Sequence, residues 1–210
     1  GFRCIKLKIG AIDFYTDLQL LRFIRQHFTA EDIEIRVDAN GAFSSILALD
    51  KIIKLSEFKL HSIEQPIQKN QTDRMAELCK TTPFPVALDE ELIGIFTLAE
   101  KEDLLVKIKP QYIILKPSFV GGFRGTQEWI SLAEKHKIGW WITSALESNI
   151  GLNAIAQWTF LQHNLMPQGL GTGALYTNNF DCPLAVSEGQ LWYKNDVDWA
   201  FDYELNLNSH

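Results

Sequence analysis

Cysteine and histidine are scarce in this sequence, and neither forms a metal-ligand pattern. The 210 residues include 3 cysteines (Cys4, Cys79 and Cys182), whose separations do not suit a structural zinc site. An odd number of cysteines cannot all pair with one another, so we expect reduced, structural thiols. None of the 5 histidines lies in a recognisable motif. Zinc chemistry is therefore disfavoured.

An excess of positive charge and long hydrophobic runs are also missing. The formal net charge is −6, which argues against nucleic-acid or anionic-membrane partners. No run of roughly eighteen apolar residues and no signal-peptide pattern occurs, so we expect a soluble, cytoplasmic protein. The hydrophobic content of 46% is enough for a sizeable core.

What the sequence does have is a regular series of charged residues at the ends of apolar runs. The series comprises Lys6 and Lys8, Asp38, Glu64, Asp89 and Lys116. Successive steps from Lys8 onward are about 25 to 30 residues, the length of one strand with its crossover helix. Side chains at the carboxyl ends of parallel strands meet at one rim, where barrel enzymes hold their active sites. The spacing predicts an α/β barrel with these residues on one rim.

Hydrophobic periodicity predicts alternating strands and helices along most of the chain. Strands are expected at 2–9, 33–38, 60–64, 86–89, 112–116, 139–143 and 166–170. Helices are expected at 13–27, 44–55, 72–80, 95–106, 125–136 and 149–163, the second with Ile46, Leu49, Ile52 and Ile53 on one face. A hairpin over 184–193, turning at Glu188-Gly189, and a tail over 199–210 should follow. We expect one domain over 1–210, with the repeats in about 1–173 and the hairpin and tail in 174–210.

The chain opens directly on its first predicted strand. A complete eight-stranded barrel of about 250 residues would need at least one more unit before it. We therefore expect the first barrel strand, and any domain that precedes it, to be absent from this chain.

The three acids suit a divalent metal ion. Asp38, Glu64 and Asp89 follow three consecutive predicted strands and offer the oxygen ligands that Mg²⁺ prefers, with Mn²⁺ as the alternative ion. Each acid taken alone could equally be a helix cap or a salt-bridge partner. The three in register predict a metal site at the rim.

The lysines suit a proton-transfer role beside that metal. Lys6 and Lys8 are two residues apart on a strand, so both point to the same side, and Lys116 enters from the far side of the barrel. A lysine acts as a base when a neighbouring cation and a metal lower its pKa. The alternatives are a solvent-facing pair on an amphipathic strand and a loop lysine before Pro117. The arrangement predicts removal of a proton next to a carboxylate, with the enolate held by positive charge.

In combination, these motifs resemble the enolase superfamily, in its muconate-cycloisomerase-like subgroup. The shared motifs are K-x-K at Lys6 and Lys8, D-A-N from Asp38, E-Q-P from Glu64, D-E from Asp89 and L-K-P around Lys116. The later segments W-I-T-S-A-L-E-S-N-I-G-L-N-A-I-A at 141–156 and G-L-G-T-G at 169–173 resemble o-succinylbenzoate synthases. The resemblance covers roughly 175 of the 210 residues. It implies a (β/α)₇β barrel that follows an N-terminal capping domain of the same polypeptide.

The resemblance also implies a reaction and a set of roles. The reaction is the Mg²⁺-dependent dehydration of 2-succinyl-6-hydroxy-2,4-cyclohexadiene-1-carboxylate to o-succinylbenzoate in menaquinone biosynthesis. Lys8 would remove the α-proton and return a proton to the departing hydroxide. Lys6 would help to hold the enolate, and Lys116 would lie against the ring as a cation over a π-system. Asn40, Ser144 and Gly171 would lie at the substrate, although Asn40 could be a turn residue and Ser144 a helix cap.

Two other functions fit the same residues. A dipeptide epimerase or N-acylamino acid racemase would use Lys8 and Lys116 as paired bases on opposite faces. Without its capping domain the chain could instead be an inert barrel fragment, and on its own we expect little or no turnover. The sequence does not determine an oligomeric state, and association with further copies is left open.

Overall fold

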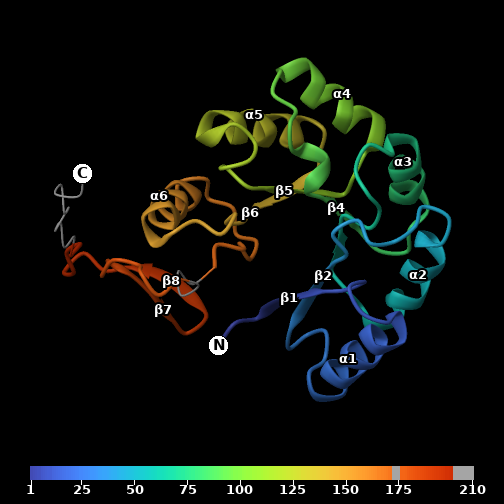
Figure 1. Cartoon of the computed structure of the whole chain (residues 1–210), viewed down its shortest axis with the longest axis horizontal. Coiled ribbons are helices and arrows are strands. Elements are labelled where there is room, and N and C mark those ends of the chain that lie inside the picture. The colour runs from blue at the N-terminus through green and yellow to red at the C-terminus, as the bar shows by residue number, and fades with distance from the viewer. Residues whose placement is uncertain (172–175, 201–210) are drawn as a thin grey trace, which may run out of the picture.

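The computed structural model describes residues 1–171 and 176–200 of the chain. Its centre is a curved sheet of six parallel strands that follow one another in chain order (Figure 1). The strands are β1 (Cys4–Lys8), β2 (Glu34–Asp38), β3 (Ser62–Glu64), β4 (Val86–Leu88), β5 (Tyr112–Leu115) and β6 (Gly139–Ile142). The parallel barrel wall predicted from the spacing is thus present.

A helix follows each strand, and the helices form an arc around the sheet (Figure 1). They are α1 (Phe14–His27), α2 (Ala48–Leu55), α3 (Thr72–Thr81), α4 (Leu98–Ile108), α5 (Gly122–Lys135) and α6 (Asn149–Phe160), with short 3₁₀ turns η1 (Ser56–Phe58) and η2 (Glu90–Leu92). Local caps fix several ends: Asp13 accepts from the backbone of Thr16, and Thr97 forms a capping box with Glu100.

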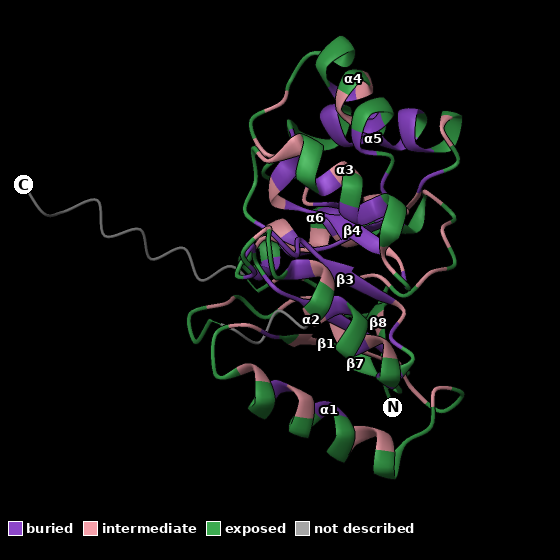
Figure 2. Ribbon diagram, turned by 90° about the vertical axis from the view of Figure 1, so that its right-hand side faces the viewer, coloured by how far each residue is buried: buried purple, intermediate pink, exposed green. Residues whose placement is uncertain are grey.

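Strands β2 to β6 are largely buried on both faces, which explains their nearly continuous apolar sequences. Ile35 and Val37 of β2 are fully buried among the helices, as are Ile63 and Leu88 on the neighbouring strands. A smaller apolar cluster of Ala87, Ile114 and Trp141 is separate from this main core. Figure 2 shows the buried strands β3 and β4 between helices whose outer sides are exposed. Because side chains alternate along a strand, burying Ile35 and Val37 against the helices directs Arg36 and Asp38 to the opposite, inner face.

The second helix differs from its prediction. It begins at Ala48 rather than at Ser44 or Ser45, and its buried residues are Ala48, Ile52 and Leu55. Ile46 precedes the helix and is 84% exposed. The Ser44 hydroxyl accepts from the backbone N–H of Leu47 within the turn before the helix. Because the helix starts later, Ile46 lies outside it, and the buried face runs through Ala48, Ile52 and Leu55. The prediction that Ile46 and Ile53 belong to the buried face was wrong, since both are exposed.

The strand expected at 166–170 is also absent as a regular strand. One parallel bridge joins Thr143 to Gly169 beyond β6. Next to it, the side-chain oxygen Oε1 of Gln168 accepts the backbone N–H of Ile142 at 2.7 Å. This side chain takes the place of a backbone carbonyl, which ends the regular ladder after one bridge.

The predicted hairpin is confirmed as β7 (Leu184–Ser187) and β8 (Gln190–Tyr193), which pair antiparallel. Glu188 and Gly189 both have positive φ, as a two-residue hairpin turn requires. A Cβ on Gly189 would lie 2.5 Å from the carbonyl oxygen of Gly1, so the turn packs directly against the start of the chain. Figure 1 shows the hairpin between α6 and that end. Most of the predicted tail, 201–210, lies outside the described residues, as does Gly173.

Candidate functional site

The charged residues predicted to share a rim lie at the carboxyl ends of the strands, except Lys6, which lies two residues before the end of β1. Lys8 is paired in register with Asp38 across β1 and β2, and Asp38 with Glu64 across β2 and β3. Asp89 directly follows β4, and Lys116 directly follows β5. The parallel sheet therefore brings residues from five successive strands to one edge.

Asp38 and Glu64 form a buried pair of carboxyl groups. Their side chains are 0% and 2% exposed. Lys6 Nζ lies 3.1 Å from Asp38 Oδ2 and 2.8 Å from Glu64 Oε2. Burial raises the pKa of Glu64 to about 9, helped by the nearby Asp38 and opposed by Lys6. Burial therefore favours the neutral, protonated form of Glu64.

The pKa values of Asp38 and Lys6, the other two members of this cluster, shift in the direction that favours the charged form. Burial opposes ionisation of Asp38, but its hydrogen bond with Glu64 and the charges of Lys6 and Lys8 keep its pKa below the usual value. Burial also lowers the pKa of Lys6, yet the negative charges of Glu64 and Asp38 outweigh it and leave that pKa raised. The cluster holds Asp38 as a carboxylate and Lys6 as an ammonium ion.

Lys8 lies at the more open side of the same cluster. Its Nζ donates to Asp38 Oδ2 and to Asn40 Oδ1, both at 2.6 Å, and its side chain is 58% exposed. Asn40 has φ +43, the left-handed region that suits asparagine in a turn, and it also contacts Lys8. The turn role and the contact with the lysine, which were alternatives from sequence, are thus both present.

Lys116 and Asp89 form the second pair of the rim. The Lys116 ammonium donates to Asp89 Oδ2, and the two side chains are 17% and 2% exposed. Lys8 and Lys116 therefore approach the rim from the ends of β1 and β5, each bound to a different acid.

The three acids do not form one closed ligand set. Within residues 1–171 and 176–200, no three His, Cys, Asp or Glu side chains are grouped closely enough to hold a metal ion. Asp38 and Glu64 are adjacent, whereas Asp89 is turned to Lys116. The expected convergence of all three on one point is therefore not seen. The donors still suit a hard cation, because Glu64 Oε1 is buried without a hydrogen-bond partner beside a second carboxylate.

Ser144 and Gly171, the predicted substrate-binding residues beyond β6, lie together. A Cβ on Gly171 would be 3.2 Å from Ser144 Oγ, and Gly171 has φ +67. The Ser144 backbone N–H bonds to the carbonyl of Gly169. The hydroxyl of Ser148, which begins α6, makes no capping hydrogen bond.

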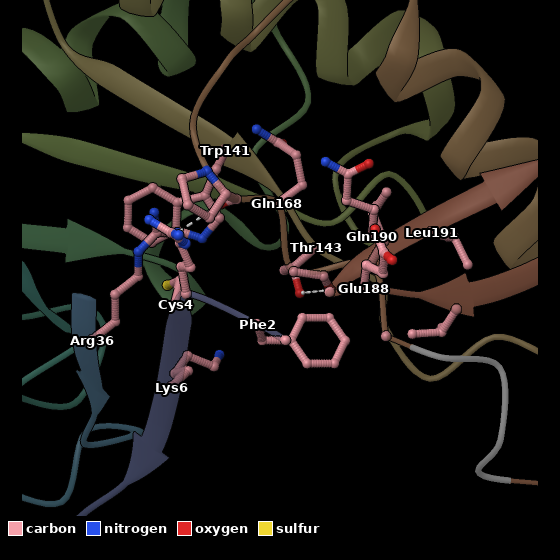
Figure 3. Close-up of a pocket in the computed structure, with 18 of the residues that line it drawn as sticks. Phe2, Cys4, Lys6, Arg36, Trp141, Thr143, Gln168, Glu188, Gln190 and Leu191 are labelled. Carbon is pink, nitrogen blue, oxygen red and sulfur yellow. Dashed lines mark hydrogen bonds between the residues drawn. The ribbon is translucent and has the colours of Figure 1, made fainter. Parts of the chain in front are cut away.

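A cavity of about 650 Å³ opens beside this segment, between β1, β6 and the hairpin (Figure 3). Of the predicted site residues, Lys6 and Gly171 line it, and the others do not. Figure 3 shows Arg36 against Trp141, with the guanidinium carbon 4.1 Å from the ring centroid. The cavity thus meets the rim at Lys6, while Lys8 and Lys116 lie outside it.

Three polar residues that follow the rim acids were not predicted. Gln65 is fully buried with φ +38; its Nε2 donates to Glu91 Oε2, and its Oε1 accepts from the backbone of Asp89 and Glu91. Gln65 thereby ties the end of β3 to the loop that carries Asp89. Glu90 accepts from Asn40 Nδ2 at 2.9 Å. The E-Q-P and D-E-E motifs contain these residues and could have drawn attention to them. Their hydrogen-bond partners could not be predicted, because Gln65 and Glu91 are about 25 residues apart and Asn40 and Glu90 about 50.

A parallel α/β barrel wall with acids and lysines on its carboxyl rim is the architecture of a known superfamily. Residues 1–196 match the family model described as enolase C-terminal domain-like, and the chain belongs to this family. It is 57% identical over 191 residues to the o-succinylbenzoate synthase of Desulfotalea psychrophila, covering 91% of this chain and 52% of that protein. The crystal structure of MenC from that organism matches with a TM-score of 0.87 and 55% identity, over 91% of this chain and 52% of that one.

More distant relatives carry other names. The N-succinylamino acid racemase of an Amycolatopsis species is 27% identical over 91% of this chain and 50% of its own length. The chain spans about half the length of the curated relatives it matches. The predicted superfamily and its barrel fold are confirmed.

Proposed function

We propose that this chain is the barrel part of an o-succinylbenzoate synthase, a lyase of menaquinone biosynthesis. The gathering of Lys6, Lys8, Asp38, Glu64, Asp89 and Lys116 at one rim carries the proposal. The 57% identity to the Desulfotalea psychrophila enzyme supports the choice of reaction. The substrate is 2-succinyl-6-hydroxy-2,4-cyclohexadiene-1-carboxylate, and the products are o-succinylbenzoate and water. Lys6, Lys8 and Lys116 supply the positive charge that a small carboxylate substrate requires.

Lys8 is the proposed acid–base residue. Its exposed ammonium group is held by Asp38 and Asn40 and lies at the open side of the rim, where substrate can approach. In the neutral form it takes the proton from the carbon that bears the carboxylate. Electrons from that C–H bond pass into the substrate carboxylate to give an enolate. They return to form the new ring double bond when the neighbouring C–O bond breaks. The same ammonium then protonates the departing hydroxide, so one residue serves both steps.

Lys6 and Lys116 are the proposed charge-stabilising residues. Lys6 remains an ammonium ion because Glu64 and Asp38 hold its pKa high, and it also lines the cavity. Lys116 directly follows β5 on the rim and has little exposure. Fixed positive charge from both lysines stabilises the enolate more than the neutral substrate, which lowers the barrier.

Asp38, Glu64 and Asp89 would hold a Mg²⁺ ion, which when bound would supply further positive charge beside the substrate carboxylate. The unpartnered Glu64 Oε1 and the paired carboxyl groups support this assignment. Asn40, Ser144 and Gly171 are proposed to contact the substrate.

None of the helices in the part of the chain that the structure describes is long and apolar enough to cross a membrane. We place the enzyme in the cytoplasm.

The test uses the full-length polypeptide that contains this chain, because the chain spans about half of its relatives. We expect it to convert the cyclohexadiene substrate to o-succinylbenzoate, measured by liquid chromatography, in a Mg²⁺-dependent manner. The chain alone, assayed in parallel, separates an active barrel from an inert fragment. Absence of product from the full-length protein would refute the proposal.

Racemisation is the second candidate, because Lys8 and Lys116 approach from opposite sides of the rim. A relative named N-succinylamino acid racemase covers 91% of this chain. Two bases on opposite faces could exchange the α-proton of an N-succinylamino acid in D₂O. Deuterium incorporation faster than dehydration of the cyclohexadiene would favour this reading.

A further inference from the structure

Asn40 is held at three points, and one of its partners has no role in the site so far. Its Oδ1 accepts from Lys8 Nζ at 2.6 Å, and its backbone N–H donates to Asp38 Oδ1 at 3.0 Å. Its Nδ2 donates to Glu90 Oε1 at 2.9 Å. Glu90 lies in η2, after β4, so this bond links the loop after β2 to the loop after β4, past the end of β3 between them.

The chemistry of the two neighbours fixes the orientation of the Asn40 amide. A lysine ammonium group can only donate, so it requires the amide oxygen. A carboxylate can only accept, so Glu90 requires the amide NH₂. With Glu90 in place, a flipped amide would face its NH₂ to an ammonium and its oxygen to a carboxylate. Glu90 therefore presents the amide oxygen to Lys8.

Among the described residues, the Glu90 side chain makes no other hydrogen bond. Its second oxygen, Oε2, is buried and accepts no hydrogen bond. The neighbouring Glu91 behaves differently, because it binds the side chain of Gln65 and the backbone of Asn70. Two adjacent glutamates thus serve different loops, and Glu90 is directed to Asn40.

We propose that Glu90 is a positioning residue for Lys8 and acts through Asn40. The proposal rests on the proposed function, in which Lys8 moves the proton. Asp38 is shared between Lys6 and Lys8, so its carboxylate alone does not define one position for the Lys8 amine. The amide oxygen of Asn40, aimed by Glu90, supplies the second fixed contact. A positioned amine raises the rate of proton transfer without altering substrate affinity.

The first experiment compares variants of the full-length polypeptide with the cyclohexadiene substrate. Glu90→Ala removes the acceptor and should lower kcat by about 10- to 100-fold, the range for a hydrogen bond to a charged group. The KM should change less than about threefold, because Glu90 itself is not a proposed substrate contact. Glu90→Gln can still present an oxygen to the Asn40 NH₂ and should recover most of kcat. Glu77→Ala, on the exposed face of α3, is the matched control.

A double-mutant cycle tests whether Glu90 works through Asn40. Asn40→Ala alone should lower kcat, and adding Glu90→Ala to it should cause less than about a threefold further loss. If the two losses multiply instead, Glu90 acts by another route and the inference fails. Equal impairment of Glu90→Gln and Glu90→Ala would also overturn it, because charge rather than amide orientation would then matter.

A readout without substrate separates this inference from the proposed function. In ¹H–¹⁵N spectra, the side-chain NH₂ of Asn40 should exchange with water faster in Glu90→Ala than in the wild type. Unchanged exchange would show that Glu90 does not hold the amide. If the wild-type protein does not dehydrate the substrate, the proposed function fails and the role for Lys8 falls with it. If it is active and Glu90→Ala matches it, only the positioning role is refuted.

Discussion

Replacing Glu64 by glutamine should stabilise the metal-free protein, although Glu64 is a proposed metal ligand. The folded chain raises the pKa of Glu64 from 4.5 to about 9, so the side chain is neutral in the fold at pH 7 and charged when unfolded. Glutamine matches the neutral acid in shape. Its NH₂ can donate to Asp38, and its oxygen can accept from Lys6.

The size of the effect follows from the linkage between protonation and folding. Between pH 4.5 and about 9, the folded state binds one more proton than the unfolded state at this site, so the wild type loses stability as pH rises. Each pH unit costs about 1.4 kcal/mol. At pH 7 the wild type therefore loses about 3 kcal/mol of its free energy of unfolding at this site. The size of the loss depends on the pKa of Glu64 in the unfolded state, as long as its pKa in the folded state stays above 7.

The assay is urea unfolding in the presence of EDTA, followed by tryptophan fluorescence. We expect the stability gain of Glu64→Gln over wild type to be small near pH 5, about 2 kcal/mol at pH 6 and about 3 kcal/mol at pH 7. Glu57→Gln, an exposed glutamate, controls for the loss of one carboxyl group. A Glu64→Gln variant that is less stable than wild type at pH 7 would refute the reasoning, since Glu64 would then be a charged, stabilising group.

Three further predictions concern the metal, the lysines and a helix contact. Mg²⁺ at 100 times the dissociation constant of the wild type should stabilise the wild type by about 2.7 kcal/mol in thermal denaturation. An equal gain in Asp89→Asn at the same Mg²⁺ concentration would exclude Asp89 as a ligand. Lys8→Ala and Lys116→Ala should each lower kcat of the full-length polypeptide by about 10²- to 10⁴-fold with unchanged circular dichroism, and full activity in either would remove its assigned role. Gly125→Ala should destabilise by at least about 1–3 kcal/mol in urea unfolding, despite the better helix propensity of alanine, because its Cβ would lie 2.1 Å from the Val120 carbonyl oxygen; an unchanged midpoint would show that the backbone yields there.

The strand pattern could be predicted because it depends on local sequence. Apolar runs that end in a charged residue every 25 to 30 positions require strands of similar length with crossovers between them. The runs that contain Ile35, Ile63 and Ile113 became β2, β3 and β5. Prediction failed where a tertiary contact replaced a local one. At β6, the side chain of Gln168 caps Ile142, and a strand pattern became a single bridge.

The residues of the candidate site could also be predicted, but their interactions could not. Alternation along a strand places Lys6 and Lys8 on one side, and the parallel sheet places Asp38, Glu64 and Asp89 on one rim. Which acid each lysine binds depends on distances between chain segments about 30 to 60 residues apart. Gln65 and Glu90 were missed for the same reason.

The motifs of the sequence were enough to identify the superfamily by resemblance. Its periodicity and spacing, which are local properties, predicted the strands and the edge at which the charges gather. Only the tertiary structure decided that burial raises the pKa of Glu64, that Asp89 turns to Lys116, and that Glu90 reaches Lys8 through Asn40. Burial and the charges of groups distant in sequence set a side chain's protonation and partner, and these become defined once the strands lie side by side.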